Sequence, residues 1–91
     1  MKLPASYTKE QALEDVNGFL DLISKDDYDE IFKMAPLMEG ISEMFDTPKG
    51  HIRHGQFEYG LDGETLEHSW TAARRNALRL QGILEWLLDS P

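Results

Sequence analysis

The chain has 91 residues, of which 41% are apolar, with 17 acidic side chains against 9 basic ones and no cysteine. This length predicts one domain spanning residues 1–91, and the missing thiols exclude disulfides and cysteine nucleophiles. An acidic surface repels nucleic acid and anionic membranes and attracts basic proteins. Because no apolar run has the length of a signal peptide or of a membrane span, the sequence predicts a soluble, cytoplasmic protein.

A first helix is predicted to begin after Thr8, because Thr8-Lys9-Glu10-Gln11 has the form of a capping box. Apolar residues then recur at helical spacing until about Ser24: Ala12, Val16, Phe19, Leu20 and Ile23. The polar triplet Lys25-Asp26-Asp27 predicts a break, and either aspartate is a candidate cap for a second helix.

That second helix carries two apolar stripes, one on each side of Pro36: Tyr28, Ile31, Phe32 and Ala35 before it, and Leu37, Ile41, Met44 and Phe45 after it. The stripes are turned by about half a revolution at about 100° per residue, so one straight helix cannot bury both. The sequence therefore predicts either a sharp kink or a new helix that has Pro36 in its first turn and ends near Phe45.

Residues 46–63 lose all helical periodicity, and a short strand or hairpin is an alternative around residues 56–61. A long helix then runs from about Glu64 to Asp89, with a heptad seam of apolar residues: Leu66, Trp70, Ala73, Ala77, Leu80, Leu84 and Leu87. The predicted fold is a small all-α domain of three or four helices, with a long C-terminal helix and an irregular loop or minimal hairpin before it.

Metal and catalytic chemistry have little support in the sequence. His51 and His54 stand in the glycine-rich segment beside Arg53, whose charge opposes a cation, and His68 follows on the long helix. No nucleophile elbow and no phosphate-binding glycine loop is present. We therefore expect no enzyme activity, no cofactor and no functional metal site.

An acidic run is the first candidate binding surface: Asp26, Asp27, Tyr28, Asp29 and Glu30, continued by Glu39, Glu43 and Asp46. The first half of the chain, up to Asp46, holds eleven acids against four lysines. One interpretation is helix-start chemistry and a solvated face; the other is a surface that docks on lysines and arginines. Three tyrosines are candidate anchors for such an interface: Tyr7, Tyr28 and Tyr59.

A second candidate surface lies on the back of the long helix, opposite the seam, and consists of Arg75, Arg79, Gly82 and Trp86. Gly82 costs roughly 1 kcal/mol relative to alanine in a helix interior, and it would let another backbone approach beside Trp86. One interpretation is that the loop of residues 46–63 folds over this face. The other is a homo-oligomer or partner contact.

A few positions together resemble the small acidic helical immunity proteins that neutralise nuclease bacteriocins: Tyr7-Thr8, the acidic middle helices, Pro48 and Gly50, and Trp70 with Arg74. The chain departs from that family after Gly50, where His51-Ile52-Arg53-His54 replaces the family's paired tyrosines and proline, and in its long last helix. No residue roles follow from this resemblance.

These observations predict a non-enzymatic acidic protein that works by contact. The leading hypothesis is an inhibitor, immunity or anti-defence factor that binds a basic partner, such as a nuclease or a nucleic-acid-binding complex. The alternative is an assembly or adaptor subunit that forms a helical homo-oligomer. Neither hypothesis involves direct binding to nucleic acid or to a membrane.

Overall fold

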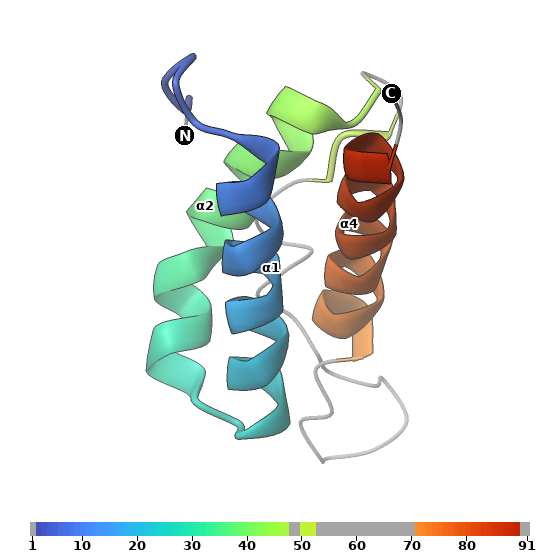
Figure 1. Ribbon diagram of the computed structural model, residues 1–91. Helices are drawn as coiled ribbons and strands as arrows, with labels where there is room; N and C mark the ends of the chain where they lie inside the picture. The colour runs from blue at the N-terminus through green and yellow to red at the C-terminus, as the bar shows by residue number, and fades with distance from the viewer. Residues whose placement is uncertain (1, 48–49, 53–70, 90–91) are drawn as a thin grey trace.

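A computed structural model describes residues 2–47, 50–52 and 71–89 of the chain (Figure 1). These residues form three helices: α1 (Lys9–Ser24), α2 (Tyr28–Phe45) and α4 (Thr71–Asp89). Over these ranges there is no strand, which confirms the predicted all-α class. The strand or hairpin that was the alternative for residues 56–61 lies outside the described residues.

Helix α1 begins and ends where the sequence predicts. The Gln11 backbone N–H donates to the Thr8 side-chain oxygen at 3.1 Å, and the Thr8 N–H donates to the Gln11 side-chain oxygen at 2.9 Å. This is the reciprocal capping box, which satisfies two amides that the first turn of a helix leaves free. The buried stripe of α1 consists of Ala12, Val16, Phe19 and Ile23.

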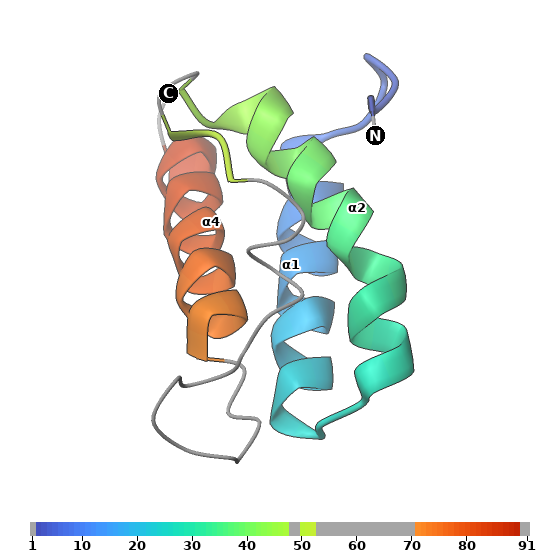
Figure 2. The ribbon, with the colours of Figure 1, turned by 180° about the vertical axis from the view of Figure 1, so that it is seen from behind.

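Helix α2 is a single helix with Pro36 inside it, and the ribbon changes direction along its length (Figure 2). This agrees with the kink rather than with a new helix at Pro36, and proline is a common cause of such bends. Ile31 and Ala35 before the proline, and Met38 and Ile41 after it, are fully buried.

The two predicted stripes on α2 were wrong at three positions, because Tyr28, Phe32 and Met44 are exposed. The reason is the arrangement of the three helices. Helix α1 contacts both α2 and α4, whereas α2 makes few contacts with α4 (Figure 1). A helix with one main neighbour buries a narrow strip, so the residues on the margins of each stripe face outwards.

Helix α4 supplies the other wall of the core. Its predicted seam is confirmed from Ala73 to Leu84, since Ala73, Ala77, Leu80 and Leu84 are all fully buried, whereas Leu87 at the end of the seam is only partly buried. The helix ends at Asp89 as predicted, whereas the predicted start near Glu64 and the first two seam residues lie outside the described residues. Among the helices described, none has the length and apolar character needed to cross a lipid bilayer.

One more segment joins the core. Ile52 is buried, and its backbone N–H donates to the Oγ of the buried Ser42 at 2.7 Å. This bond fixes the short segment of residues 50–52 against the last turns of α2. A buried N–H without a partner costs free energy, so Ser42 gives the segment its place in the core.

Candidate interaction surfaces

The structure keeps the two predicted surfaces apart. The acidic residues Asp26 to Glu30 lie at the turn between α1 and α2, at the bottom of Figure 1. Trp86 and Gly82 lie in the second half of α4, whose C-terminal end is at the top of the same view. A single small partner site therefore does not include both sets, and each is described by itself.

The turn after α1 is a Schellman motif. The Asp27 N–H donates to the Leu22 carbonyl at 3.1 Å, and the Asp26 N–H donates to the Ile23 carbonyl at 3.2 Å. Asp26 takes the left-handed position of this motif, with φ of 52°, and it is the only non-glycine residue with positive φ in the described part of the chain. Glycine is the usual residue at that position because it has no Cβ to clash.

The prediction that Asp26 or Asp27 caps the second helix is confirmed for the position of Asp27, but the expected side-chain cap bond is absent. Asp26 belongs to the end of α1, and Asp27, which stands at the N-cap position of α2, makes no side-chain cap hydrogen bond. Its backbone carbonyl accepts the first bond of α2, from the Ile31 N–H at 2.9 Å. Asp29 and Glu30 do lie in the first turn, where a helix dipole favours negative charge.

Two lysines lie beside this turn, and each pairs with a nearby acid. Lys25 pairs with Asp21 at 2.8 Å, and Lys33 pairs with Glu30 at 3.1 Å. Hydrogen bonding to these carboxylates, together with their charge, raises the pKa of each lysine. Both pairs are exposed and contribute little to stability.

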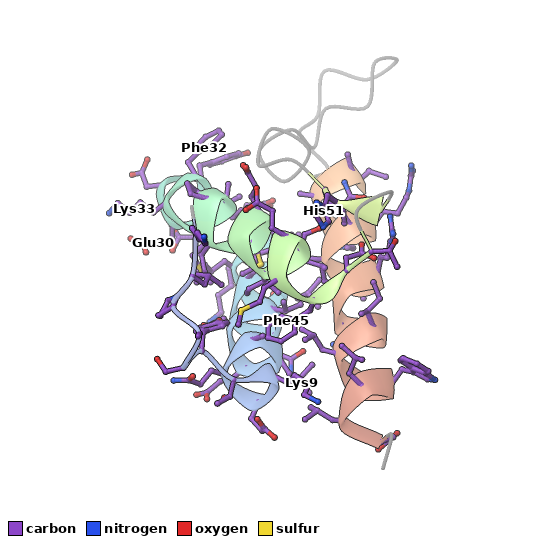
Figure 3. The ribbon with its side chains drawn as sticks, turned by 90° about the horizontal axis from the view of Figure 1, so that it is seen from above. Lys9, Glu30, Phe32, Lys33, Phe45 and His51 are labelled. Carbon is purple, nitrogen blue, oxygen red and sulfur yellow. The ribbon has the colours of Figure 1, made fainter. Side chains whose placement is uncertain are left out.

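Exposed aromatic side chains adjoin the acids. Tyr28 is 41% exposed and Phe32 is 46% exposed. Figure 3 shows Phe32, Glu30 and Lys33 at the outer side of α2. We call the set Asp26, Asp27, Tyr28, Asp29 and Glu30 the acidic turn. The acidic turn has carboxylates with exposed aromatic side chains next to them. In protein interfaces, charge speeds the encounter of two partners and buried aromatic side chains contribute much of the affinity.

Asp46, the last acid of the run, does not extend the acidic turn. The Asp46 side chain is only 5% exposed, and its Oδ2 accepts from the Nη2 of Arg79 at 2.9 Å. Its Oδ1 accepts from the Thr47 N–H at 2.8 Å. The inclusion of Asp46 in an acidic surface was therefore wrong, because the structure uses its carboxylate to tie the end of α2 to α4.

Gly50 packs directly against the ion pair between Asp46 and Arg79. A Cβ on Gly50 would lie 2.2 Å from the Arg79 Nη2 and 2.7 Å from the Asp46 Oδ1. The chain thus crosses directly over the pair, and a side chain at this position would have to displace the Arg79 guanidinium or the Asp46 carboxylate. The covering loop predicted as one alternative does reach the back of α4, at Arg79.

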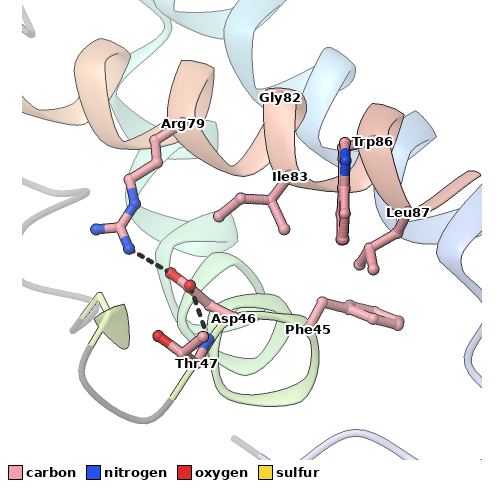
Figure 4. Close-up of a pocket in the computed structure, with 8 residues that line it drawn as sticks. All are labelled: Phe45, Asp46, Thr47, Arg79, Gly82, Ile83, Trp86 and Leu87. Carbon is pink, nitrogen blue, oxygen red and sulfur yellow. Dashed lines mark hydrogen bonds and ion pairs between the residues drawn. The ribbon is translucent and has the colours of Figure 1, made fainter. Parts of the chain in front are cut away.

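Beyond Arg79, the residues on the back of α4 are exposed or partly exposed. A groove of about 480 Å³ runs between α4 and the end of α2, and its lining includes Phe45, Asp46, Arg79, Ile83, Trp86 and Leu87 (Figure 4). Trp86 is 68% exposed. A Cβ on Gly82 would meet no atom within 4 Å, so the fold itself does not require glycine there. Arg75 is exposed on the same helix.

The remaining candidates have other roles or lie outside the described residues. The Tyr7 hydroxyl donates to the Asp15 carboxylate, and its ring packs against the core, so Tyr7 is not a free anchor. Burial, with the Asp15 carboxylate contributing, raises the pKa of Tyr7 well above its usual value. Tyr59 lies outside the described residues.

The histidines stay untested as metal ligands. His51 is exposed, and His54 and His68 lie outside the described residues. Within residues 2–47, 50–52 and 71–89, no three potential ligands come together. The expectation that no functional metal site exists therefore remains a prediction.

Comparisons of the chain with protein-family models, with curated proteins and with solved structures each gave no match. Function is therefore inferred from the surfaces alone.

Proposed function

We propose that this protein acts by contact rather than by catalysis, as an inhibitor, immunity or anti-defence factor. Its acidic turn binds a basic protein that handles nucleic acid. The observation that carries the proposal is Asp26, a carboxylate at a left-handed position where glycine is less strained.

The conformation of Asp26 separates the two interpretations of the acidic run. Non-glycine residues in left-handed conformation cost roughly 1–2 kcal/mol, with aspartate and asparagine tolerated best. Asp27 makes no side-chain cap bond, so side-chain capping does not account for it either. Residues that are strained or unused by the fold are candidates for function.

The chemistry of the acidic turn favours a basic partner. Over residues 21–33 there are five acids against two lysines, and both lysines are engaged with carboxylates on their own helices. A protein that binds nucleic acid contacts the phosphates through lysine and arginine side chains. A cluster of carboxylates can bind the same side chains in place of the phosphates. Tyr28 and Phe32 add apolar contact, which a purely electrostatic encounter lacks.

The test uses two triple variants with the same change of net charge. The first replaces acids of the turn: Asp27→Asn, Asp29→Asn and Glu30→Gln. The control replaces exposed acids elsewhere on the described helices: Glu10→Gln, Glu14→Gln and Glu43→Gln. Each tagged protein is used to capture partners from a lysate of the source cells, and the captured proteins are identified and assayed for nucleic-acid binding or cleavage.

We expect the parent and the control to retain a basic partner whose nucleic-acid activity they inhibit, and the turn variant to lose it. The complex should also dissociate when salt rises from about 0.1 M to about 1 M, because the Debye length falls from about 10 Å to about 3 Å. Equal binding by both triple variants, or a partner that does not handle nucleic acid, would reject the proposal.

A further inference from the structure

The outward side of α4 has an internal symmetry about Gly82. From Arg75 to Asp89, seven exposed residues make up this side, which we call the α4 outer face: Arg75, Leu78, Arg79, Gly82, Glu85, Trp86 and Asp89. Counted from Gly82, they stand three, four and seven positions away in each direction. Offsets of three, four and seven return to one side of a helix, so the seven form a continuous strip.

Residues at equal distance from Gly82 are complementary in chemistry. Four positions away on either side are two large apolar side chains, Leu78 and Trp86, which are 48% and 68% exposed. Arg79 and Glu85 lie three positions before and after Gly82. Arg75 and Asp89 lie seven positions before and after it. At equal distances from Gly82, an apolar side chain is therefore matched by an apolar one, and each basic side chain by an acidic one.

We propose that the α4 outer face binds a second copy of this chain, with the two α4 helices antiparallel about a two-fold axis at Gly82. Such an axis places each residue at the level of the one equally far on the other side of Gly82 in the second copy. Trp86 then lies beside Leu78 of the second copy, and Arg75 and Arg79 face Asp89 and Glu85.

The charge layout of α4 supports this partner because it does not suit a single helix. Arg75 and Arg79 are like charges four residues apart, and so are Glu85 and Asp89, which is unfavourable on one helix. Asp89 also lies in the last turn, where the helix dipole disfavours an acid. Within the described residues, Arg75, Glu85 and Asp89 form no ion pair. An antiparallel copy brings opposite charges to each of them.

Gly82 and Arg79 fit their places in this arrangement. Glycine at the axis lets the two helices approach closely, and in the monomer nothing lies within 4 Å of its missing side chain. Arg79 already donates to Asp46 through Nη2. Its guanidinium has five N–H donors, so binding to Asp46 leaves others for Glu85 of the second copy.

The expected dimer is weak. Residues 75–89 span about 21 Å at about 1.5 Å per residue, and one helix from each copy covers less than the roughly 1,200–2,000 Å² of a typical stable interface. Association should therefore depend on concentration. Analytical ultracentrifugation over about 1 µM to about 1 mM covers weak to moderate affinities. The parent should change from monomer to dimer within this range.

Glycine substitutions give a matched pair of variants. Gly82→Leu should weaken association at least tenfold, and Gly18→Leu should leave it unchanged. Both glycines are helical and exposed, with nothing within 4 Å of an added Cβ, but only Gly82 lies on α4. Leucine is the better helix former, so both variants should stay folded by circular dichroism. Trp86→Ala should also weaken the dimer.

Charge reversal tests the antiparallel orientation. Arg75→Glu alone and Asp89→Arg alone should each weaken the dimer, because each places like charges opposite one another at two symmetric sites. The double variant Arg75→Glu/Asp89→Arg should recover the parent's affinity, since the swapped charges again face each other across the axis.

Three results would overturn the proposal. The first is a parent that stays monomeric at about 1 mM, whether or not another protein binds Trp86. The second is a dimer that Gly82→Leu and Trp86→Ala do not affect, since it would use another surface. The third is a double charge variant as weak as the single ones, which would exclude antiparallel pairing about Gly82.

Discussion

At the start of α2, the turn that joins α1 to α2 is held by backbone hydrogen bonds between residues at most five positions apart. At the end of α2 it is fixed by side-chain partners 10 and 33 positions away, through Ser42 with Ile52 and Asp46 with Arg79. The first region leaves its carboxylates on the surface, whereas the second buries one. Aspartate therefore supplies surface charge at the start of α2, whereas at its end Asp46 forms an ion pair that joins α2 to α4.

The role of an aspartate in this protein depends on whether a cation from another helix reaches it. Among the described residues, the cations near Asp27 are Lys25 and Lys33, which lie close to it in the chain. Asp46 instead faces the guanidinium of Arg79 on α4. We expect mutations at the end of α2 to change stability and mutations in the acidic turn to change binding. Four predictions test that division.

The largest effect is expected from Ser42→Ala. The substitution leaves the buried Ile52 N–H without its acceptor, and a buried unsatisfied donor costs about 1–3 kcal/mol. The control is Ser24→Ala in the first region, where the exposed Ser24 hydroxyl donates to the Asp21 carbonyl and its loss should cost a few tenths of a kcal/mol. Urea unfolding measures both, and equal destabilisation would remove the distinction between the two regions.

Asp46→Asn should destabilise the protein by about 1 kcal/mol, because the amide keeps an acceptor for the Thr47 N–H but loses the charge that Arg79 requires. The value is kept low because Arg79 is 47% exposed and solvent screens the pair. Asp27→Asn should change stability by less than about 0.5 kcal/mol. A larger effect at Asp27 than at Asp46 in thermal or urea unfolding would contradict the division.

Gly50→Ala should cost roughly 1 kcal/mol, because the added methyl group must displace the Arg79 guanidinium from Asp46. Arg79 can move because its end is flexible, so the main loss is the ion pair itself. In a background that already carries Arg79→Ala, Gly50→Ala should therefore cost clearly less. A double-mutant cycle measures this coupling, and additive costs would show that Gly50 serves another purpose.

The smallest effect is a gain. Asp26→Gly should stabilise the protein by a few tenths to about 1 kcal/mol, because glycine adopts the left-handed position of the Schellman motif without strain. The same variant should bind the proposed basic partner less well. Loss of stability in urea unfolding would mean that the Asp26 side chain supports the turn, and Asp26 would then have a structural role rather than a binding role.

Local patterns in the sequence sufficed for much of the fold. The capping box at Thr8 depends on residues three positions apart, and the seam through Ala77 and Leu80 depends on helical periodicity. Both follow from the geometry of one helix, so neither needs knowledge of a partner. The exposure of Phe32 was not predictable in this way, because it depends on which sides of α2 the other helices cover.

For the candidate surfaces too, local features could be predicted from the sequence, whereas contacts between distant residues could not. The acidic turn was located from its composition, but the left-handed Asp26 was not, because nothing in Lys25-Asp26-Asp27 distinguishes a cap of α2 from the end of α1. The pairing of Asp46 with Arg79 was also missed, since it joins residues 33 positions apart. Gly50 beside the irregular segment was the one signal available, as a glycine where another part of the chain comes close.

Pro36 has a further consequence for how α2 opens. Proline contributes no amide hydrogen, so the helix has a gap in its ladder of bonds one turn after Phe32. Segments with fewer internal bonds exchange their amide hydrogens through local opening rather than through global unfolding. The N-terminal half of α2, which carries the acidic turn, is thereby separated from the half that Ser42 and Asp46 anchor. The amides of the acidic turn should exchange with deuterium faster than those of residues 38–45, and the turn can adjust to the proposed basic partner without opening the half of α2 that Ser42 and Asp46 anchor.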